Sequence, residues 1–222
     1  MDVSVVIPAR NEERLIGAAL ASLRAQTHPP GEIILVDNGC TDRTPELART
    51  FGARVVREDR PGYYCAARRG ALHARGDILA FCDADTLYPP RWLARAVQAF
   101  RDDDRVQAVY GPFRSSETTS SLSGVVVRAI MSASRALGVE YTCGCNFLMR
   151  RDGYHRTGGY PDDPGRFAAD IDLGNALRRL GRVAYLPGLM VRTSFRTFRS
   201  QGPAWVARTW WSVVAQRRRR PS

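Results

Sequence analysis

The chain lacks lysine, and no acidic residue follows Asp172. All 33 basic side chains are arginines, and 11 of them lie in residues 173–222. Residues 1–172 are therefore neutral, and the net charge of +11 belongs to the last 50 residues. This asymmetry predicts an anionic partner for the end of the chain, either phosphate-rich or a membrane surface, with a solvated basic tail as the alternative.

Long apolar runs are also absent, and none approaches the ~20 residues that a helix needs to cross a bilayer. The five cysteines include no CxxC pair, so a zinc site is not expected. If residues 143–145 were extended, Cys143 and Cys145 would point to opposite faces of a strand, which disfavours a disulfide between them. With an odd cysteine count and no signal peptide recognised at Met1, we expect free thiols and a cytoplasmic protein.

The composition is that of a globular protein, with 44% hydrophobic and 25% charged residues among 222. It excludes collagen-like, mucin-like and wholly disordered chains. We expect one domain over residues 1–200, followed by a basic, tryptophan-containing tail at 201–222.

Strand-like and helix-like stretches alternate in the first hundred residues. Predicted strands cover 3–7, 32–36, 54–56 and 78–82, and predicted helices cover 11–23, 41–51, 63–74 and 89–100. Asn11 is the expected cap of the first helix, and Thr41 or Asp42 that of the second. This order predicts an α/β fold with a mainly parallel sheet and helices on both faces. Ligands of such sheets bind beyond the carboxyl ends of the strands.

The second half is less regular. Strands are predicted at 106–110, 147–149 and 183–186, helices at 125–137, 170–180 and 203–220, and a polar loop at 115–123. The apolar side of the 125–137 helix should carry Val126, Ile130, Ala133 and Leu137.

Acidic side chains follow two of the predicted strands. Asp83 and Asp85 come directly after the strand at 78–82, where a turn could bring both carboxylates onto one Mg²⁺ or Mn²⁺ together with substrate phosphates. A pair of acids in a solvated turn is the alternative. Asp37 follows the strand at 32–36 and could accept a hydrogen bond from a base or a ribose. We interpret Asp42 as a helix cap, and the turn at 8–12 as a place where a base could lie.

Several ordered motifs together resemble the family 2 glycosyltransferases of the GT-A fold, over residues 3–198. They are VSVVIPARNEE (3–13), ILVDNGCTDRT (34–44), ARGDILAFCDADT (74–86), GCNFLMRR (144–151), GGY (158–160) and ADIDL (169–173). The resemblance implies a Rossmann-like GT-A fold with a mixed, mainly parallel sheet. It also implies a glycosyltransferase that uses a nucleotide-sugar donor, most commonly a UDP-sugar, and inverts the sugar's configuration.

The resemblance also implies roles for individual residues. Asp170 is the expected base, with Asp172 as the next candidate or a sugar ligand, and helix capping is the alternative for both. The metal ligands are Asp83 and Asp85. The other implied contacts are, for the nucleotide, Pro8, Arg10, Glu12, Asp37, Arg68 and Ala84, and for the sugar or acceptor, Gly144, Cys145 and Asn146.

Four positions depart from the family's pattern. Arg68 replaces a common Asn, Cys145 a usual Gly, and Ala169 a usual Glu. Arg192 stands where a His that helps to bind metal or phosphate is often found. An arginine cannot bind a metal but can pair with a diphosphate, so we expect Arg192 to contact the diphosphate.

The tail combines Trp205, Trp210 and Trp211 with four consecutive arginines, a pattern that suits a helix lying on an anionic membrane. This pattern would agree with a peripheral location on the inner membrane face. It would also agree with an acceptor that is lipid-linked or a cell-envelope glycan. The alternative is that these tryptophans pack on the domain and that the consecutive arginines are simply solvated. No nucleic-acid partner is expected, because no zinc finger or RNA-binding aromatic motif occurs. Rival functions are an inactive GT-A-like scaffold or another nucleotide-sugar enzyme.

Overall fold

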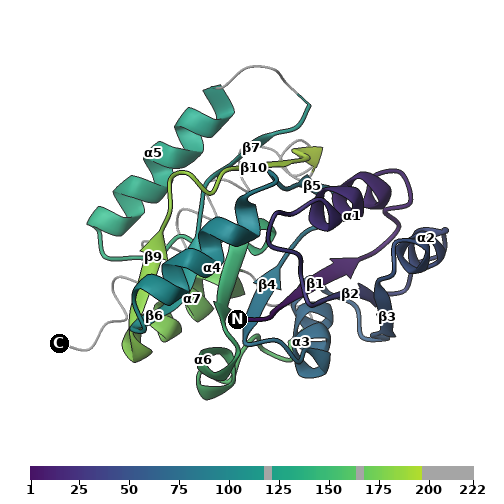
Figure 1. The fold of residues 1–222 in the computed structure, drawn as a ribbon, viewed down its shortest axis with the longest axis horizontal. Coiled ribbons are helices and arrows are strands. Elements are labelled where there is room, and N and C mark those ends of the chain that lie inside the picture. Colours follow the sequence, from purple (N-terminus) through teal and green to yellow (C-terminus); the bar gives the residue numbers. More distant parts are fainter. Residues whose placement is uncertain (118–121, 164–167, 197–222) are drawn as a thin grey trace.

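The computed structural model describes residues 1–117, 122–163 and 168–196. Over these residues a seven-stranded sheet has the order β3-β2-β1-β4-β8-β6-β9 (Figure 1). All its neighbouring pairs are parallel except those of β8, which is antiparallel to β4 and β6. The predicted α/β class with a mixed, mainly parallel sheet is confirmed. The strands are β1 Val3–Ala9, β2 Glu32–Asp37, β3 Arg54–Arg57, β4 Ile78–Phe81, β6 Val106–Tyr110, β8 Phe147–Arg150 and β9 Arg182–Tyr185.

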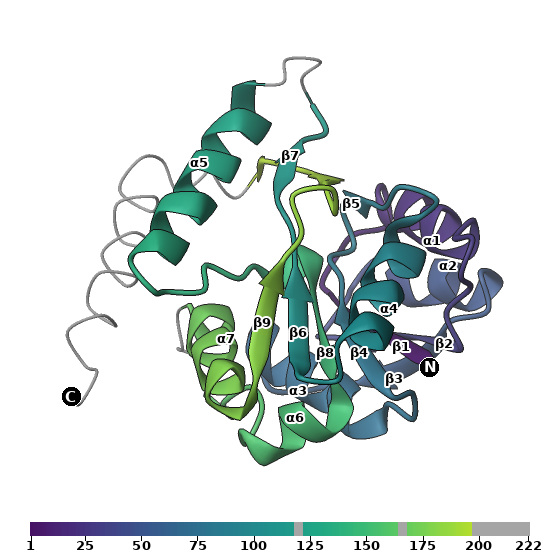
Figure 2. The same cartoon turned by 60° about the vertical axis from the view of Figure 1, so that its left-hand side comes forward.

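Helices cover both faces of this sheet (Figure 2). On one face α1 meets the start of α4, where the Gln26 side chain accepts a hydrogen bond from the Leu93 amide at 2.9 Å. On the other face α3 meets α7 through Tyr64 and Asp170. The helices are α1 Ile16–Arg24, α2 Thr44–Thr50, α3 Tyr63–His73, α4 Trp92–Asp102, α5 Leu122–Ala136, α6 Arg151–Arg156 and α7 Ala169–Leu180, with a 3-10 turn η1 at Gly144–Asn146.

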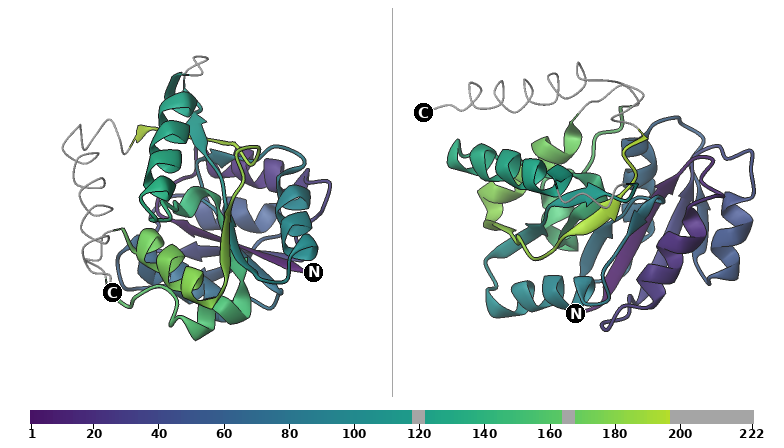
Figure 3. Two further views of the ribbon diagram at one scale, coloured as in Figure 1. Left: turned by 90° about the vertical axis from the view of Figure 1, so that its left-hand side faces the viewer. Right: turned by 90° about the horizontal axis from the view of Figure 1, so that it is seen from above.

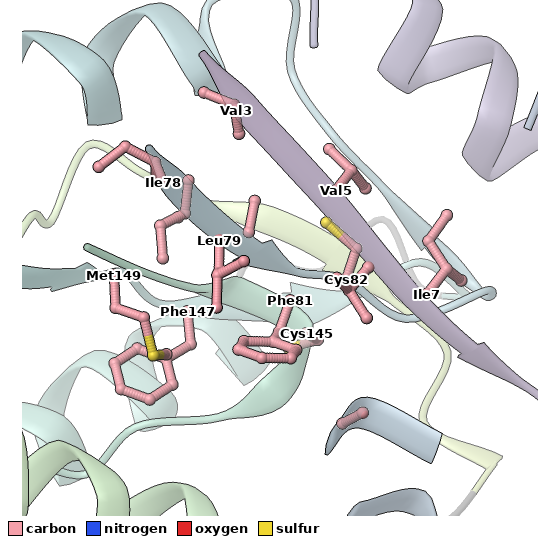
Figure 4. Packing of buried hydrophobic residues seen from close by; sticks show 14 of the residues in the cluster. Val3, Val5, Ile7, Ile78, Leu79, Phe81, Cys82, Cys145, Phe147 and Met149 are labelled. Carbon is pink, nitrogen blue, oxygen red and sulfur yellow. The ribbon is translucent and has the colours of Figure 1, made fainter. Parts of the chain in front are cut away.

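The core lies between the central strands and these helices. Side chains of β1, β4 and β8 such as Val5, Phe81 and Phe147 are completely buried and pack together (Figure 4). Burial on both faces explains why these strands are continuous apolar runs rather than alternating ones.

A second, three-stranded sheet has the order β5-β10-β7 and was not predicted. Its strands are β5 Thr86–Leu87, β7 Phe113–Ser115 and β10 Val191–Thr193. In β10 and β5, Thr193 lies opposite Thr86, directly after the Asp83–Asp85 turn. The small sheet therefore carries the end of the described chain to the edge where ligands are expected.

Two predictions about helices were wrong. Asn11 does not cap α1, which begins five residues later without a side-chain cap. In α5 the predicted apolar side is not the packed one, since Val126 is 48% exposed and Ala133 is exposed as well. The helix instead packs along β7, away from the central sheet, through small residues such as Gly124, whose position allows close approach to Arg114 and Met190 (Figure 3).

Other predictions concern segments that lie partly or wholly outside the described residues. The predicted loop at 115–123 includes 118–121, and the predicted helix at 203–220 lies wholly outside them. The division into 1–200 and 201–222 stays a prediction for the same reason. Among the described helices, none combines the length and apolarity that a membrane span requires.

Candidate active site

A cleft of about 320 Å³ opens at the carboxyl ends of β1, β2 and β4. Parallel-sheet geometry places it there, because the turns after these strands converge on one edge. Predicted nucleotide and metal residues form most of its wall. The lining residues are Pro8, Ala9, Arg10, Glu12, Asn38, Gly62, Tyr63, Asp83, Ala84 and Asp85.

The turns after β1 and β2 are joined by hydrogen bonds from backbone amides. The Thr41 amide donates to Asn11 Oδ1 at 2.8 Å, and the Glu12 amide to Thr44 Oγ1 at 2.7 Å. Asn11 has φ +57°, so its role is to turn the chain and bridge to Thr41 rather than to cap a helix. Asp42 accepts from the Thr44 amide at 3.0 Å, but it does not cap α2 as interpreted, because the N-cap residue of this helix is Arg43 and its side chain makes no capping bond.

Asp37 and its neighbour Asn38 have different surroundings. Asp37 Oδ1 accepts the Cys40 amide at 2.7 Å, and Asp37 is not among the residues that line the cleft. Asn38 does line it, and its amide group donates to the carbonyls of Glu58 and Arg60 and accepts from the Gly62 amide. Sequence reasoning missed Asn38, which fixes the loop leading into α3.

Asp83 is the most perturbed carboxyl group of the cleft. Burial, and then the charges of Asp85 and Asp170, raise its pKa to about 8. Its Oδ1 atom is buried with no hydrogen-bond partner among the described residues. An ionised Asp83 therefore lacks a positive partner, which a divalent cation would supply.

Asp85 is held on both of its oxygens. Thr193 Oγ1 donates to Oδ1 at 3.2 Å, and Arg196 Nη2 donates to Oδ2 at 3.2 Å. Within the described part of the chain, no group of three or more His, Cys, Asp or Glu side chains is arranged to hold a metal. Two aspartates with an orphaned oxygen nevertheless fit a Mg²⁺ or Mn²⁺ that draws its remaining ligands from water and substrate phosphates.

Asp170 lies in the first turn of α7 among tyrosines. Its carboxylate accepts hydrogen bonds from Tyr160 at 2.5 Å and from Tyr64 at 3.2 Å. Burial raises the pKa of Asp170 to about 6, and the two hydroxyls and the Gly144 amide oppose the rise. A carboxylate with a pKa near neutrality is suited to accept a proton. Sequence reasoning identified Asp170 but missed both tyrosines, of which Tyr160 ends the GGY motif.

Asp172 faces elsewhere. Two residues along a helix rotate a side chain by about 200°, so Asp170 and Asp172 leave α7 in nearly opposite directions. Asp172 lines a different cavity of about 300 Å³ with Gly158, Gly159 and Pro161. The structure therefore does not bring Asp172 to the donor cleft.

The predicted sugar-binding segment forms the 3-10 turn η1. A Cβ at Gly144 would collide with the Tyr63 hydroxyl, so glycine is required where this turn passes α3. The turn also corrects the expectation for Cys143 and Cys145, whose sulfurs lie 3.5 Å apart rather than on opposite faces. All five cysteines are free, as expected.

Asn146 is fully buried and engaged inside the protein. It accepts from Trp92 Nε1 at 2.8 Å and donates to the carbonyls of Pro112 and Leu189. Because Asn146 is 0% exposed, its predicted contact with a sugar would require the groups that cover it to move.

Of the three arginines predicted at the donor site, Arg10 lines the cleft, whereas Arg68 and Arg192 are not among its lining residues. Arg68 donates to the carbonyls of Gly158 and Tyr160, and thereby fixes the loop that carries Tyr160. Arg192 alternates along β10 with Thr193, which faces Asp85, and its guanidinium lies 3.5 Å from the Ser116 carbonyl. Arg196, four residues beyond Arg192, contacts the cleft residues Glu12 and Asp85 instead, and sequence reasoning missed it.

Comparison with known proteins points to one family. The family model described as "Glycosyl transferase family 2" matches residues 4–158. The chain is 36% identical over 101 residues to dolichyl-phosphate hexose transferase of Haloferax volcanii, covering 46% of this chain and 44% of that protein. It is 31% identical over 196 residues to 4,4'-diaponeurosporenoate glycosyltransferase of Staphylococcus haemolyticus, covering 80% and 52%. The chain thus spans about half the length of these curated relatives.

Solved structures share the fold. A mannosyltransferase of Pyrobaculum calidifontis in complex with GDP-Man and Mn²⁺ superposes with a TM-score of 0.78 at 25% identity, covering 99% of this chain and 65% of that one. Glucosyl-3-phosphoglycerate synthase of Mycobacterium tuberculosis, in complex with Mn²⁺, UDP-Glc and phosphoglyceric acid, gives a TM-score of 0.71 at 25% identity, covering 100% and 81%.

Proposed function

The chain belongs to glycosyl transferase family 2, and on this premise we propose that it transfers a sugar from a nucleoside-diphosphate sugar to an acceptor hydroxyl. One observation carries the proposal: the cleft holds the Asp83–Asp85 pair, and Tyr64, the neighbour of the cleft residue Tyr63, donates a hydrogen bond to Asp170 at 3.2 Å. A carboxylate pair suited to a metal–diphosphate and a separate carboxylate suited to take a proton thus share one site.

The donor would lie along the turns after β1, β2 and β4. Pro8, Arg10, Glu12 and Ala84 line the cleft and would contact the nucleotide, with Asn38 beside them. Asp83 and Asp85 would hold a Mg²⁺ or Mn²⁺, which offsets the charge that develops on the departing nucleoside diphosphate. A UDP-sugar is the donor we expect first, and a GDP-sugar second, because the similar structures contain UDP-Glc or GDP-Man.

On the acceptor side Asp170 would act as the base. It takes the proton of the acceptor hydroxyl while that oxygen bonds to the anomeric carbon and the nucleoside diphosphate leaves with its electron pair. Attack opposite the leaving group inverts the configuration. Tyr64 and Tyr160 orient the carboxylate for this step.

The acceptor that we propose is lipid-linked or a cell-envelope glycan. Two relatives carry names that refer to lipids, dolichyl phosphate and diaponeurosporenoate. The basic tail at 203–222 would hold the enzyme on an anionic membrane at its cytoplasmic face. Deleting these residues should abolish flotation with anionic liposomes, and unchanged flotation would exclude this role for the tail.

Calorimetry with UDP, GDP and dTDP, each with and without Mn²⁺, tests the donor site. We expect one nucleotide to bind in a metal-dependent way to the wild type and to lose that dependence in Asp85→Ala. Asp102→Ala, which removes a carboxylate at the far end of α4, is the matched control and should bind like the wild type. If none of the nucleotides binds under either condition, the inactive-scaffold alternative becomes the better account.

A further inference from the structure

Arg196 places a positive charge between two carboxylates of the cleft. Its Nη2 atom lies 2.9 Å and 2.7 Å from the two oxygens of Glu12 and 3.2 Å from Asp85 Oδ2. Glu12 belongs to the turn after β1 and Asp85 to the turn after β4, so one guanidinium joins two walls of the donor site. Neither the family motifs nor the resemblance assigns a role to this residue.

The fold delivers Arg196 to this place through several contacts. Antiparallel pairing of β10 with β5 sets Thr193 beside Thr86, and their hydroxyls bond at 2.7 Å. Three residues later, the Arg196 amide and Nε both donate to Ser194 Oγ, at 3.3 and 3.2 Å. Ser194 in turn donates to Glu117 at 2.8 Å. The guanidinium is thus oriented by its own segment as well as by the carboxylates.

The contact of Arg196 with Asp85 also competes with the binding of a divalent cation to Asp85. An oxygen that accepts a guanidinium N–H at 3.2 Å cannot at the same time present that lone pair to a divalent cation. The side chain of Arg196 is 52% exposed, whereas those of Glu12 and Asp85 are 20% and 18% exposed. The arginine can therefore leave toward solvent or toward a ligand, while the two carboxylates remain in place.

We propose that Arg196 is a resident counter-ion of the donor site: it neutralises Glu12 and Asp85 in the free protein and exchanges onto the diphosphate when a divalent cation takes its place. The inference rests on the proposed function, because the diphosphate is that of the donor. A guanidinium released from two carboxylates finds another anionic partner in phosphate oxygens, which it can contact through two parallel N–H groups.

The exchange predicts that cation and nucleotide bind cooperatively. The cation alone must displace Arg196 without offering it another partner, so it binds weakly. A nucleoside diphosphate draws the guanidinium away from Asp85 and thereby frees the oxygen for the cation. Coupling between two ligands is reciprocal, so the cation must strengthen nucleotide binding by the same factor.

Electron paramagnetic resonance of free Mn²⁺ measures this directly without any catalytic turnover. We expect Arg196→Gln to bind Mn²⁺ alone about tenfold more tightly than the wild type, a typical size for such coupling. We also expect the factor by which UDP or GDP strengthens Mn²⁺ binding to shrink by about the same amount. Arg196→Lys keeps the positive charge and should leave the affinity for Mn²⁺ alone close to that of the wild type.

Arg101→Gln is the matched control for the loss of one positive charge. Arg101 lies in the last turn of α4, which leads to the start of β6 at the amino ends of the strands, opposite the cleft. Equal Mn²⁺ affinity of the wild type and Arg196→Gln overturns the proposal, and so does an equal gain in Arg101→Gln. Failure of the wild type to bind any nucleotide would contradict the donor function instead. The Mn²⁺ affinities of the wild type and Arg196→Gln are measured without nucleotide, so they test the role of Arg196 independently of that outcome.

Discussion

The two sides of the cleft are held together in different ways. On the β1–β2 side, backbone amides of one turn donate to side chains of the next, as from Thr41 to Asn11. On the other side, charged groups are held by side chains from distant parts of the chain. Tyr64 reaches Asp170 across 106 residues, and Arg196 reaches Asp85 across 111. The first side is thus fixed by its own backbone, whereas the second depends on groups that a ligand can replace.

Replacing the base should produce the largest effect and would show that the second side carries the chemistry. We expect Asp170→Asn to lower kcat by about 10²- to 10⁴-fold, the usual contribution of a positioned acid or base. Donor binding should change little, because Asp170 is not among the residues that line the donor cleft. Single-turnover kinetics together with calorimetry of the nucleotide would measure both quantities.

Asp172→Asn is the control within the same helix. Asp172 leaves α7 on the other side, so we expect this variant to lose less than about tenfold in kcat. A larger loss for Asp172→Asn than for Asp170→Asn would transfer the role of base to Asp172, the second candidate identified from the sequence.

The pH dependence tests how the tyrosines tune that base. Burial raises the pKa of Asp170 to about 6, so the carboxylate is ionised above this pH and kcat should rise with pH through about 6. The Tyr160 hydroxyl stabilises the ionised form. Tyr160→Phe should therefore move the rise to higher pH and lower kcat at pH 6 by up to about tenfold, with recovery in alkaline buffer.

A pH–rate profile from pH 5 to 9 would measure the shift. Tyr185→Phe is a suitable control, because the buried Tyr185 hydroxyl has no hydrogen-bond partner among the described residues and lies on β9. If Tyr160→Phe loses activity equally at every pH, Tyr160 supports the structure around Asp170 without tuning its proton affinity.

The sequence is a good guide to the first side of the cleft, and to the Asp83–Asp85 turn beside it, because these signals are local. Continuous apolar strands followed directly by polar turns reveal β1, β2 and β4, and the topology of a parallel sheet then brings residues such as Glu12, Asp83 and Asp85 to one edge. Asn38 escaped notice because the neighbouring Asp37 seemed the stronger ligand by charge, although Asp37 is used to close its own turn.

The second side could not be predicted in the same way. Strands β5, β7 and β10 contain two or three residues, too few for any periodicity to be recognised. Without them nothing in the sequence indicates that Arg196, rather than Arg192, reaches Asp85. For tyrosines such as Tyr64 and Tyr160 a core role is the ordinary expectation, and only their hydrogen bonds to Asp170 distinguish them.

The smallest expected effect concerns the bridge between the first two turns. Asn11 combines φ +57° with a hydrogen bond to the Thr41 amide, so two substitutions separate these contributions. Asn11→Gly loses only the bond and should lower the free energy of unfolding by about 1 kcal/mol. Asn11→Ala loses the bond and adds the strain of a left-handed backbone, for a total of about 2 kcal/mol. Urea denaturation would measure both, and equal stability of the two variants would mean that the turn relaxes and that the β1–β2 side is less rigid than its hydrogen bonds indicate.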